Sequence, residues 1–291
     1  MIRTVALWLI ALLVTLGSAY YQRATGPTYP LSGTVVLKGT SLAYQLVRSH
    51  SGAGDAPVRV RVPRAGATGT LLWRRFRAEE PWVTVPMDRQ GDTLVAALPH
   101  QLPAGKLEYT VRIVEGEEEV MAPPDRTAVI RFKGDVPAAV LVVHIAAMFG
   151  AMLFSTRAAL EVFSKQSKFT ALTWWTIGGL LLGGLILGPI VQKCAFGAYW
   201  TGWPVGTDLT DNKTLVAMIG WLGAALALRT VPRPGVWVVL AALLMLGVFM
   251  IPHSLRGSER ALNGASTGTV GYPPDDSLRG EKGLDKVPEI Y

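Results

Sequence analysis

The sequence has few residues of the kinds that carry chemistry. It contains one cysteine, Cys194, and four histidines in 291 residues. A single cysteine excludes an internal disulfide and a cysteine-based zinc cluster, and no metal site is predicted. The chain also lacks a nucleophile elbow, a phosphate-binding loop, an HExxH helix and a dinucleotide fingerprint. The sequence therefore gives catalysis no positive support and favours a protein that is not an enzyme.

Charge is scarce as well. Only 17% of the residues are charged, 50% are hydrophobic, and the mean hydropathy is +0.32. Such a chain is too apolar for an ordinary soluble domain and predicts several segments in the lipid bilayer. The net charge of +7 comes from scattered basic residues without a clustered stripe. We therefore expect no nucleic-acid partner.

Residues 1–21 begin with a basic residue, Arg3, and continue as an apolar run from Val5 to Tyr21. They are either a signal peptide, with small residues at Gly17 and Ala19 for cleavage, or a signal anchor. The run is longer than the usual signal core and ends in two tyrosines that suit a membrane interface. These features favour an uncleaved transmembrane anchor.

Residues 22–134 have a different pattern. Short runs with period-two alternation, among them "SLAYQLVRS", "VRVRVP" and "DTLVAALP", are separated by turn segments such as "SGAGDAP" and "RQGD". They predict seven or eight strands and a small β-sandwich. The run "LPAGKLEYTVRI" resembles the late part of an immunoglobulin or fibronectin-type module, in which a tyrosine, here Tyr109, hydrogen-bonds back across a corner. The resemblance is one of architecture and implies no chemistry.

Residues 135–256 predict a four-helix transmembrane bundle. The uncharged stretches are 136–156, 169–192, 214–228 and 234–255. A helix needs about 20 residues to cross a bilayer, so the third stretch is short. We expect its helix to start nearer Leu209. None of the four stretches contains Asp, Glu, Lys or Arg, so no transport pathway is indicated.

The basic residues of the short loops predict the orientation. They gather in two loops: Arg157, Lys165 and Lys168 in one, and Arg229 and Arg233 in the other. By the positive-inside rule both loops are cytoplasmic. The expected location is the cytoplasmic (inner) membrane, with the β-sandwich, the aromatic loop 194–212 and the tail 257–291 on the extracytoplasmic side.

Two histidines fall in the outer half of the predicted spans, His144 and His253. A transmembrane histidine is costly in hydrocarbon and usually faces a bundle interior or a cavity. Neutral imidazoles from two helices could hold haem b or help to bind a quinone. The two differ in depth by six residues, about 9 Å along a helix, which argues against a shared haem. The alternatives are a helix-to-helix hydrogen bond for His144 and an interfacial position for His253 after Pro252.

Two further groups of residues are candidates. The first is the small-residue run Gly179, Gly183, Gly184 and Gly188, which favours close helix packing or, alternatively, room for a flat macrocycle, a quinone or a lipid. The second lies at the outer face: Asp208, Asp211 and Lys213, which could form a proton or cation site with His253. The alternative is that these carboxylates only cap a helix N-terminus.

The tail 257–291 is rich in Gly, Ser, Pro and charge and has too few apolar residues for a core of its own. We expect it to be disordered or laid out on a partner. The leading functional hypothesis is a non-catalytic integral membrane subunit of a respiratory or electron-transfer assembly, which contacts other subunits through the outer sandwich and the tail. The alternative is a membrane electron carrier that binds haem b or a quinone with His144 and His253.

Overall fold

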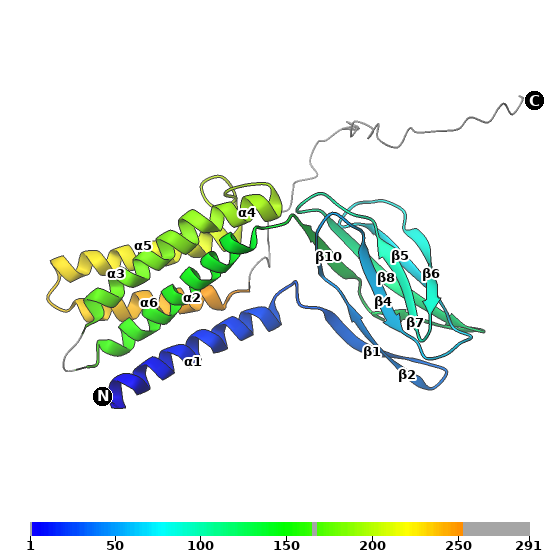
Figure 1. Cartoon of the computed structure of the whole chain (residues 1–291), viewed down its shortest axis with the longest axis horizontal. Coiled ribbons are helices and arrows are strands. Elements are labelled where there is room, and N and C mark those ends of the chain that lie inside the picture. The colour runs from blue at the N-terminus through cyan, green and yellow to red at the C-terminus, as the bar shows by residue number, and fades with distance from the viewer. Residues whose placement is uncertain (1, 165–167, 253–291) are drawn as a thin grey trace, which may run out of the picture. The chain divides into compact units, whose positions relative to one another are not determined.

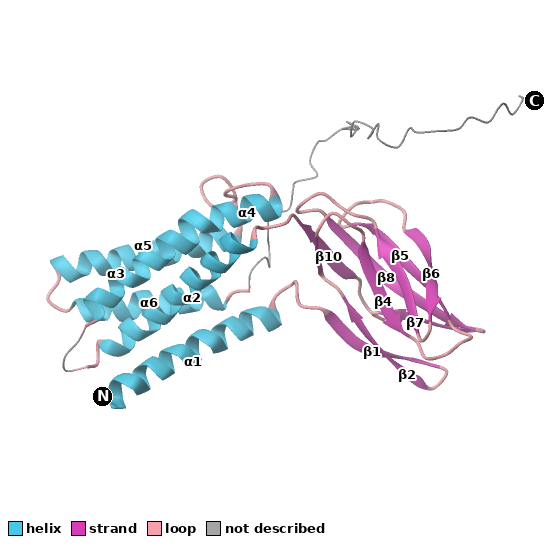
Figure 2. Cartoon of the chain, in the orientation of Figure 1, coloured by secondary structure: helices cyan, strands magenta, loops and turns pink. Residues whose placement is uncertain are grey.

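The computed structural model describes residues 2–164 and 168–252. The fold is α plus β, with an N-terminal apolar helix, a sheet-rich body and a group of further apolar helices (Figure 1; Figure 2). Two predictions lie outside the described residues: His253 and the tail 257–291.

The first helix, α1 (Ile2–Thr25), contains the predicted anchor and continues four residues past Tyr21. It is one of three helices in the described part of the chain that are long and apolar enough to cross a membrane. The others are α2 (Ala138–Glu161) and the continuous helix Phe169–Phe196. The chain is therefore a membrane protein by the length and composition of these helices.

Within residues 31–133 the chain forms ten strands. Their bounds are β1 (Leu31–Leu37), β2 (Thr40–Leu46), β3 (Ser49–Ser51), β4 (Ala56–Arg61), β5 (Thr68–Arg75), β6 (Val83–Gln90), β7 (Thr93–Leu98), β8 (Lys106–Glu115), β9 (Glu118–Ala122) and β10 (Ala128–Lys133). Strands β1 and β2 pair with each other, and the rest follow the order β3-β10-β8-β5-β6-β7-β4, with β9 on β8. The first half of β6 pairs with β5 and its end pairs with β7, so this strand joins two parts of the sheet.

A hydrophobic core lies among these strands because most of them contribute buried residues, often at alternate positions, to the same cluster. Tyr109 on β8 is fully buried in it, and its hydroxyl donates to the carbonyl oxygen of Val47 over 2.7 Å. Tyr109 thus forms a hydrogen bond, but not the bond across a neighbouring corner that the resemblance implied. Its acceptor lies between β2 and β3, so the bond joins segments that are far apart in the sequence.

The remaining helices start close to the predicted bounds. They are α3 (Phe169–Gly179), the π-helical stretch η1 (Leu180–Leu187), α4 (Gly188–Phe196), α5 (Leu209–Thr230) and α6 (Pro234–Met250). As expected, α5 begins at Leu209, after Asp208 as its N-cap. Because α5 carries charges and α6 has 17 residues, neither is among the three long apolar helices. A second core, with the fully buried Trp221 of α5 among its residues, lies between these helices.

Helix α2 extends beyond the predicted stretch 136–156 and includes two charged residues. Helix α2 continues past Ser155 to Glu161, and Arg157 and Glu161 are only 5% and 6% exposed. The two side chains lie one helical turn apart and form an ion pair. Because each charge has an opposite charge as its partner, both can be buried. The guanidinium of Arg157 also lies over the ring of Trp8 on α1.

Candidate functional site

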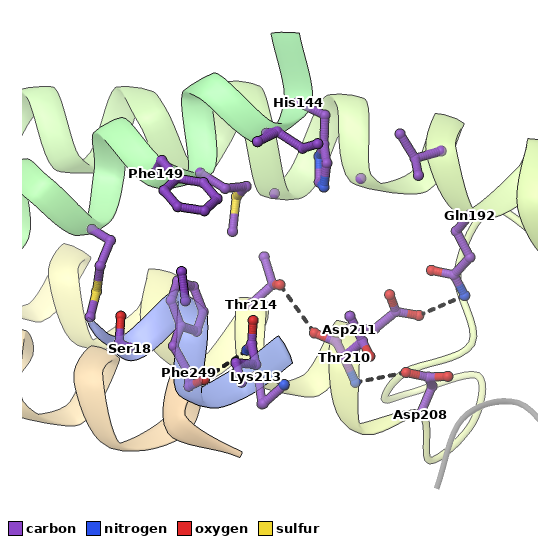
Figure 3. A pocket seen from close by; sticks show the side chains of 18 of the residues that line it. Ser18, His144, Phe149, Gln192, Asp208, Thr210, Asp211, Lys213, Thr214 and Phe249 are labelled. Carbon is purple, nitrogen blue, oxygen red and sulfur yellow. Dashed lines mark hydrogen bonds between the residues drawn. The ribbon is translucent and has the colours of Figure 1, made fainter. Parts of the chain in front are cut away.

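A cavity of about 320 Å³ lies between α1, α2, α4, α5 and α6 (Figure 3). Each of these helices contributes side chains to its wall. The polar ones are Thr15, Ser18 and Gln22 of α1, Arg131 of β10, His144 of α2, Gln192 of α4, and Thr210, Asp211, Lys213 and Thr214 of α5, with the N-cap residue Asp208. The cavity therefore brings together most of the residues that were predicted as candidate sites.

His144 points into this cavity from α2. Its Nδ1 lies 2.8 Å from the carbonyl oxygen of Gly183 in η1. A carbonyl only accepts hydrogen bonds, so Nδ1 carries a proton and, in the neutral ring, Nε2 carries the lone pair. The predicted helix-to-helix hydrogen bond and the predicted cavity position of His144 are thus both present.

The backbone around Gly183 explains how this bond forms. The N–H of Gly188 bonds to the carbonyl of Gly183, five residues earlier, as in a π-helix. Pro189 follows at the start of α4; it has no N–H, and its ring clashes with the carbonyl four residues before it. The α-helical ladder is therefore interrupted there. The Gly183 carbonyl accepts from Gly188 and uses its other lone pair for His144.

The four glycines pack against two different helices. A Cβ at Gly179 would lie 2.9 Å from Cβ of Ala151 on α2, and one at Gly183 would lie 2.9 Å from Cβ of Ala147. A Cβ at Gly184 would lie 2.5 Å from Cγ2 of Thr214 on α5. These glycines let the helix approach α2 and α5 closely. Gly184 and Gly188 also line the cavity.

Asp211 organises the loop between α4 and α5. One of its oxygens, Oδ2, accepts from the backbone N–H groups of Thr201 and Gly202 over 2.6 and 2.9 Å. The same oxygen accepts from the hydroxyl of Thr201 and from Nε2 of Gln192, over 3.3 and 3.2 Å. Four donors from the loop and from α4 therefore meet at this one oxygen. This pattern gives Asp211 a structural role, because it ties the loop between α4 and α5 to the first turn of α5.

Lys213 and Asp208 also form hydrogen bonds within the protein. Nζ of Lys213 donates to the carbonyl of Ile251 over 2.6 Å, which joins α5 to the end of α6. Asp208 caps α5 by accepting from the N–H of Thr210 over 2.7 Å. The predicted cap is therefore present. The predicted cluster of these groups with His253 stays a prediction, because His253 lies outside the described residues.

Sequence reasoning missed two parts of this site. Gln192 is a single amide near the end of an apolar helix and belongs to no motif. The polar face of α1 had a detectable signal: Thr15, Ser18 and Gln22 are spaced by three and four residues and therefore share one helix face. Gln22 reaches across to α6, where its Nε2 donates to the carbonyl of Phe249 over 2.7 Å.

The cavity wall also contains apolar side chains. These are Ile145, Met148, Phe149, Met152, Val191, Phe196 and Phe249. The arrangement thus offers hydrogen-bonding groups to one part of a ligand and aromatic and thioether surface to another. Within residues 2–164 and 168–252, no three His, Cys, Asp or Glu side chains are grouped so that they could hold a metal ion.

Comparisons of the chain with protein-family models, with curated proteins and with solved structures gave no match. The functional argument therefore depends on the chemistry of the cavity.

Proposed function

We propose that the protein is an integral membrane protein that binds a quinone-type ligand in the cavity between α1, α2, α4, α5 and α6, as a component of membrane electron transfer. The observation that carries the proposal is the imidazole of His144, which projects into the cavity with Nδ1 bonded to Gly183 and Nε2 left for a ligand. A transmembrane histidine that faces a cavity is a functional residue by default.

The two kinds of wall support an amphipathic ligand. His144 and Gln192 offer polar groups, whereas Phe149, Met152 and Phe249 offer apolar surface. A quinone has the same division, with ring oxygens at one end and an isoprenoid chain at the other. The apolar helices around the cavity would give such a ligand access from the bilayer.

Haem b, expected from the sequence as the other possible ligand, has less support. A b-type haem needs an axial ligand on each face of its ring. The described part of the cavity wall supplies one imidazole, that of His144, and the proposed second ligand, His253, lies outside it. A volume of about 320 Å³ is also at the small end of ligand pockets, which suits a single-ring headgroup better than a macrocycle.

Two measurements on the purified full-length protein test this function. Organic extraction followed by chromatography should recover a quinone in a stoichiometry that His144→Leu lowers. A reduced-minus-oxidised absorbance spectrum should show no haem α-band. A strong α-band that disappears in His144→Leu would identify the ligand as haem and not a quinone. Extracts without any quinone would count against the proposal.

The proposed architecture follows the expectations from the sequence. The β-rich body would be an immunoglobulin-like sandwich on the extracytoplasmic side of the cytoplasmic membrane, and α2 to α6 would form the four-helix bundle beside the anchor α1. The proposed orientation is supported by basic residues at the connections between helices. Lys168 directly precedes α3, Arg229 lies in the last turn of α5, and Arg233 directly precedes α6.

A second candidate function is that of a non-catalytic subunit of a larger membrane assembly. The observation that favours it is the edge of β1: in the described part of the chain this strand, from Leu31 to Leu37, pairs only with β2. An edge strand without a second neighbour is a ready surface for strand addition by a partner. Purification in mild detergent should then recover larger partners, and replacing Val36 by Pro should release them. A protein that runs alone in both forms would exclude this function.

A further inference from the structure

Two side chains of the cavity wall, His144 and Gln192, have donated their hydrogens to the protein and present acceptors, and so do three hydroxyl groups of the wall. We infer that the site selects ligands that donate hydroxyl hydrogens, and that it therefore binds a hydroquinone more tightly than the corresponding quinone. This inference rests on the proposed function and adds to it the form of the ligand that is recognised.

His144 supplies the first acceptor. Because Nδ1 gives its hydrogen to the carbonyl of Gly183, Nε2 of the neutral ring has a lone pair and no hydrogen. No partner for Nε2 is found among residues 2–164 and 168–252. A hydroxyl of the ligand can donate to this nitrogen, whereas a quinone carbonyl would face it with a second lone pair.

Gln192 supplies the second acceptor. Its Nε2 donates to Oγ1 of Thr201 over 2.6 Å and to Oδ2 of Asp211 over 3.2 Å. The carboxylate of Asp211 only accepts, so the amide nitrogen must be the atom that faces it. Both N–H bonds of the amide are thereby used, and the carbonyl oxygen of Gln192 is the group left for the cavity (Figure 3).

Three hydroxyl groups of the wall have used their hydrogens as well. Thr15 and Ser18 on α1 donate to the carbonyls of Ala11 and Thr15, and Thr214 on α5 donates to the carbonyl of Thr210. Each of these oxygens keeps only lone pairs for a ligand. Together with His144 on α2 and Gln192 on α4, these residues bring acceptors from four helices to the same space.

The guanidinium of Arg131 on β10 lines the wall as a donor. Lys213 is the other charged donor, and one of its hydrogens is used on Ile251. Its ammonium group also disfavours a bare cation, which would otherwise suit an acceptor-rich cavity. A neutral ligand with two hydroxyl groups matches this lining better than a metal ion or a ligand that carries only carbonyls. Leaving a buried acceptor without a donor costs binding energy, and this cost is the basis of the selection.

Equilibrium binding to the full-length protein in detergent, without oxygen, tests the inference. The probes are decylubiquinol and decylubiquinone. We expect the quinol to bind at least about fivefold more tightly, since a net hydrogen bond contributes about 1 kcal/mol. Equal affinities, or tighter binding of the quinone, would overturn the inference and leave the proposed function standing. Binding of neither form would overturn both.

The variant His144→Gln provides a matched comparison. A glutamine amide can turn either its N–H₂ or its oxygen toward the ligand, so we expect the preference for the quinol to become smaller than in the wild type. Nitrogen-15 spectra of the histidine rings give a second readout on the wild-type protein, with the variant identifying the signals of His144. A protonated Nδ1 and an unprotonated Nε2 agree with the inference; the opposite tautomer would overturn it.

Discussion

The imidazole Nδ1 of His144 on α2 lies 2.8 Å from the carbonyl oxygen of Gly183 in the π-helical stretch η1. This bond joins two apolar helices at the wall of the cavity and sets the direction in which the ring points. It exists because the backbone before Pro189 leaves the α-helical pattern. Predictions about packing, loop closure, buried charge and pH follow from this and related contacts.

The close packing of α2 against the helix 169–196 predicts different outcomes at two adjacent glycines. A Cβ at Gly179 meets Cβ of Ala151 at 2.9 Å and the carbonyl oxygen of Ala147 at 3.1 Å, whereas a Cβ at Gly178 meets nothing within 4 Å. We expect Gly179→Ala to lower the free energy of unfolding by about 1 to 3 kcal/mol, as overpacking does. Gly178→Ala should leave it unchanged or raise it. Thermal unfolding in detergent, followed by circular dichroism, measures both; equal effects would contradict the packing.

Asp211 is expected to control the order of the loop between α4 and α5. Asp211→Ala leaves the N–H groups of Thr201 and Gly202 without their acceptor, at a cost of about 1 to 3 kcal/mol for each buried group. Limited proteolysis within residues 197–208 should become much faster. The control is Asp208→Asn, which keeps an N-cap on α5 and should behave like the wild type. Resistance of Asp211→Ala to proteolysis would refute this role.

The buried ion pair at the end of α2 should contribute far more to stability than an exposed ion pair does. Glu161→Gln leaves the charge of Arg157 buried without its partner, and we expect a loss of roughly 3 to 5 kcal/mol. Asp92, whose side chain is 60% exposed in its ion pair with Arg61, is the control. Asp92→Asn should change stability by less than about 1 kcal/mol. Similar losses of stability in the two variants would show that the burial of the pair in α2 does not determine the size of the loss.

Tyr109 predicts the pH dependence of the β-rich domain. Burial raises the pKa of its hydroxyl above the usual value of about 10. The unfolded chain therefore releases this proton at lower pH than the folded chain, so the stability contributed by neutral Tyr109 is full below about pH 10 and falls as the pH rises further.

The variant Tyr109→Phe should remove this part of the alkaline decline. It should also cost about 0.5 to 1.5 kcal/mol at pH 8, because the bond to Val47 is lost. Unfolding temperatures of the full chain between pH 8 and 11 check both effects, with Tyr29→Phe, at an exposed position before β1, as the control. An unchanged alkaline decline in Tyr109→Phe would assign it to other groups.

The sequence was informative where a local pattern has one physical cause. Alternating residues predicted eight of the strands, and Asp208 before an apolar run predicted the start of α5 at Leu209. The short β3 was missed because three residues carry no periodicity, and β9 because it begins within the acidic run 115–119. The end of α2 was misplaced because Arg157 was taken as a loop residue, whereas its ion pair with Glu161 allows the helix to continue.

The candidate site was predictable only in part. His144, Asp211 and Lys213 were identified because charged or titratable residues are unusual in apolar helices. Their arrangement depends on contacts between distant segments, such as that of Gln192 with Asp211, which no local pattern encodes. The contribution of α1 through Gln22 and Ser18 likewise becomes visible only when the helices are packed together.

The most direct test of the central claim is to locate a bound quinone on the chain. A photoreactive azidoquinone, activated on the full-length protein and mapped by mass spectrometry, should label residues of α2 and α5 that line the cavity, near Met148 and Thr214. An excess of unlabelled quinol should suppress this labelling. Labelling spread over the lipid-facing sides of the helices, or labelling that quinol does not suppress, would contradict the claim that this cavity binds quinones.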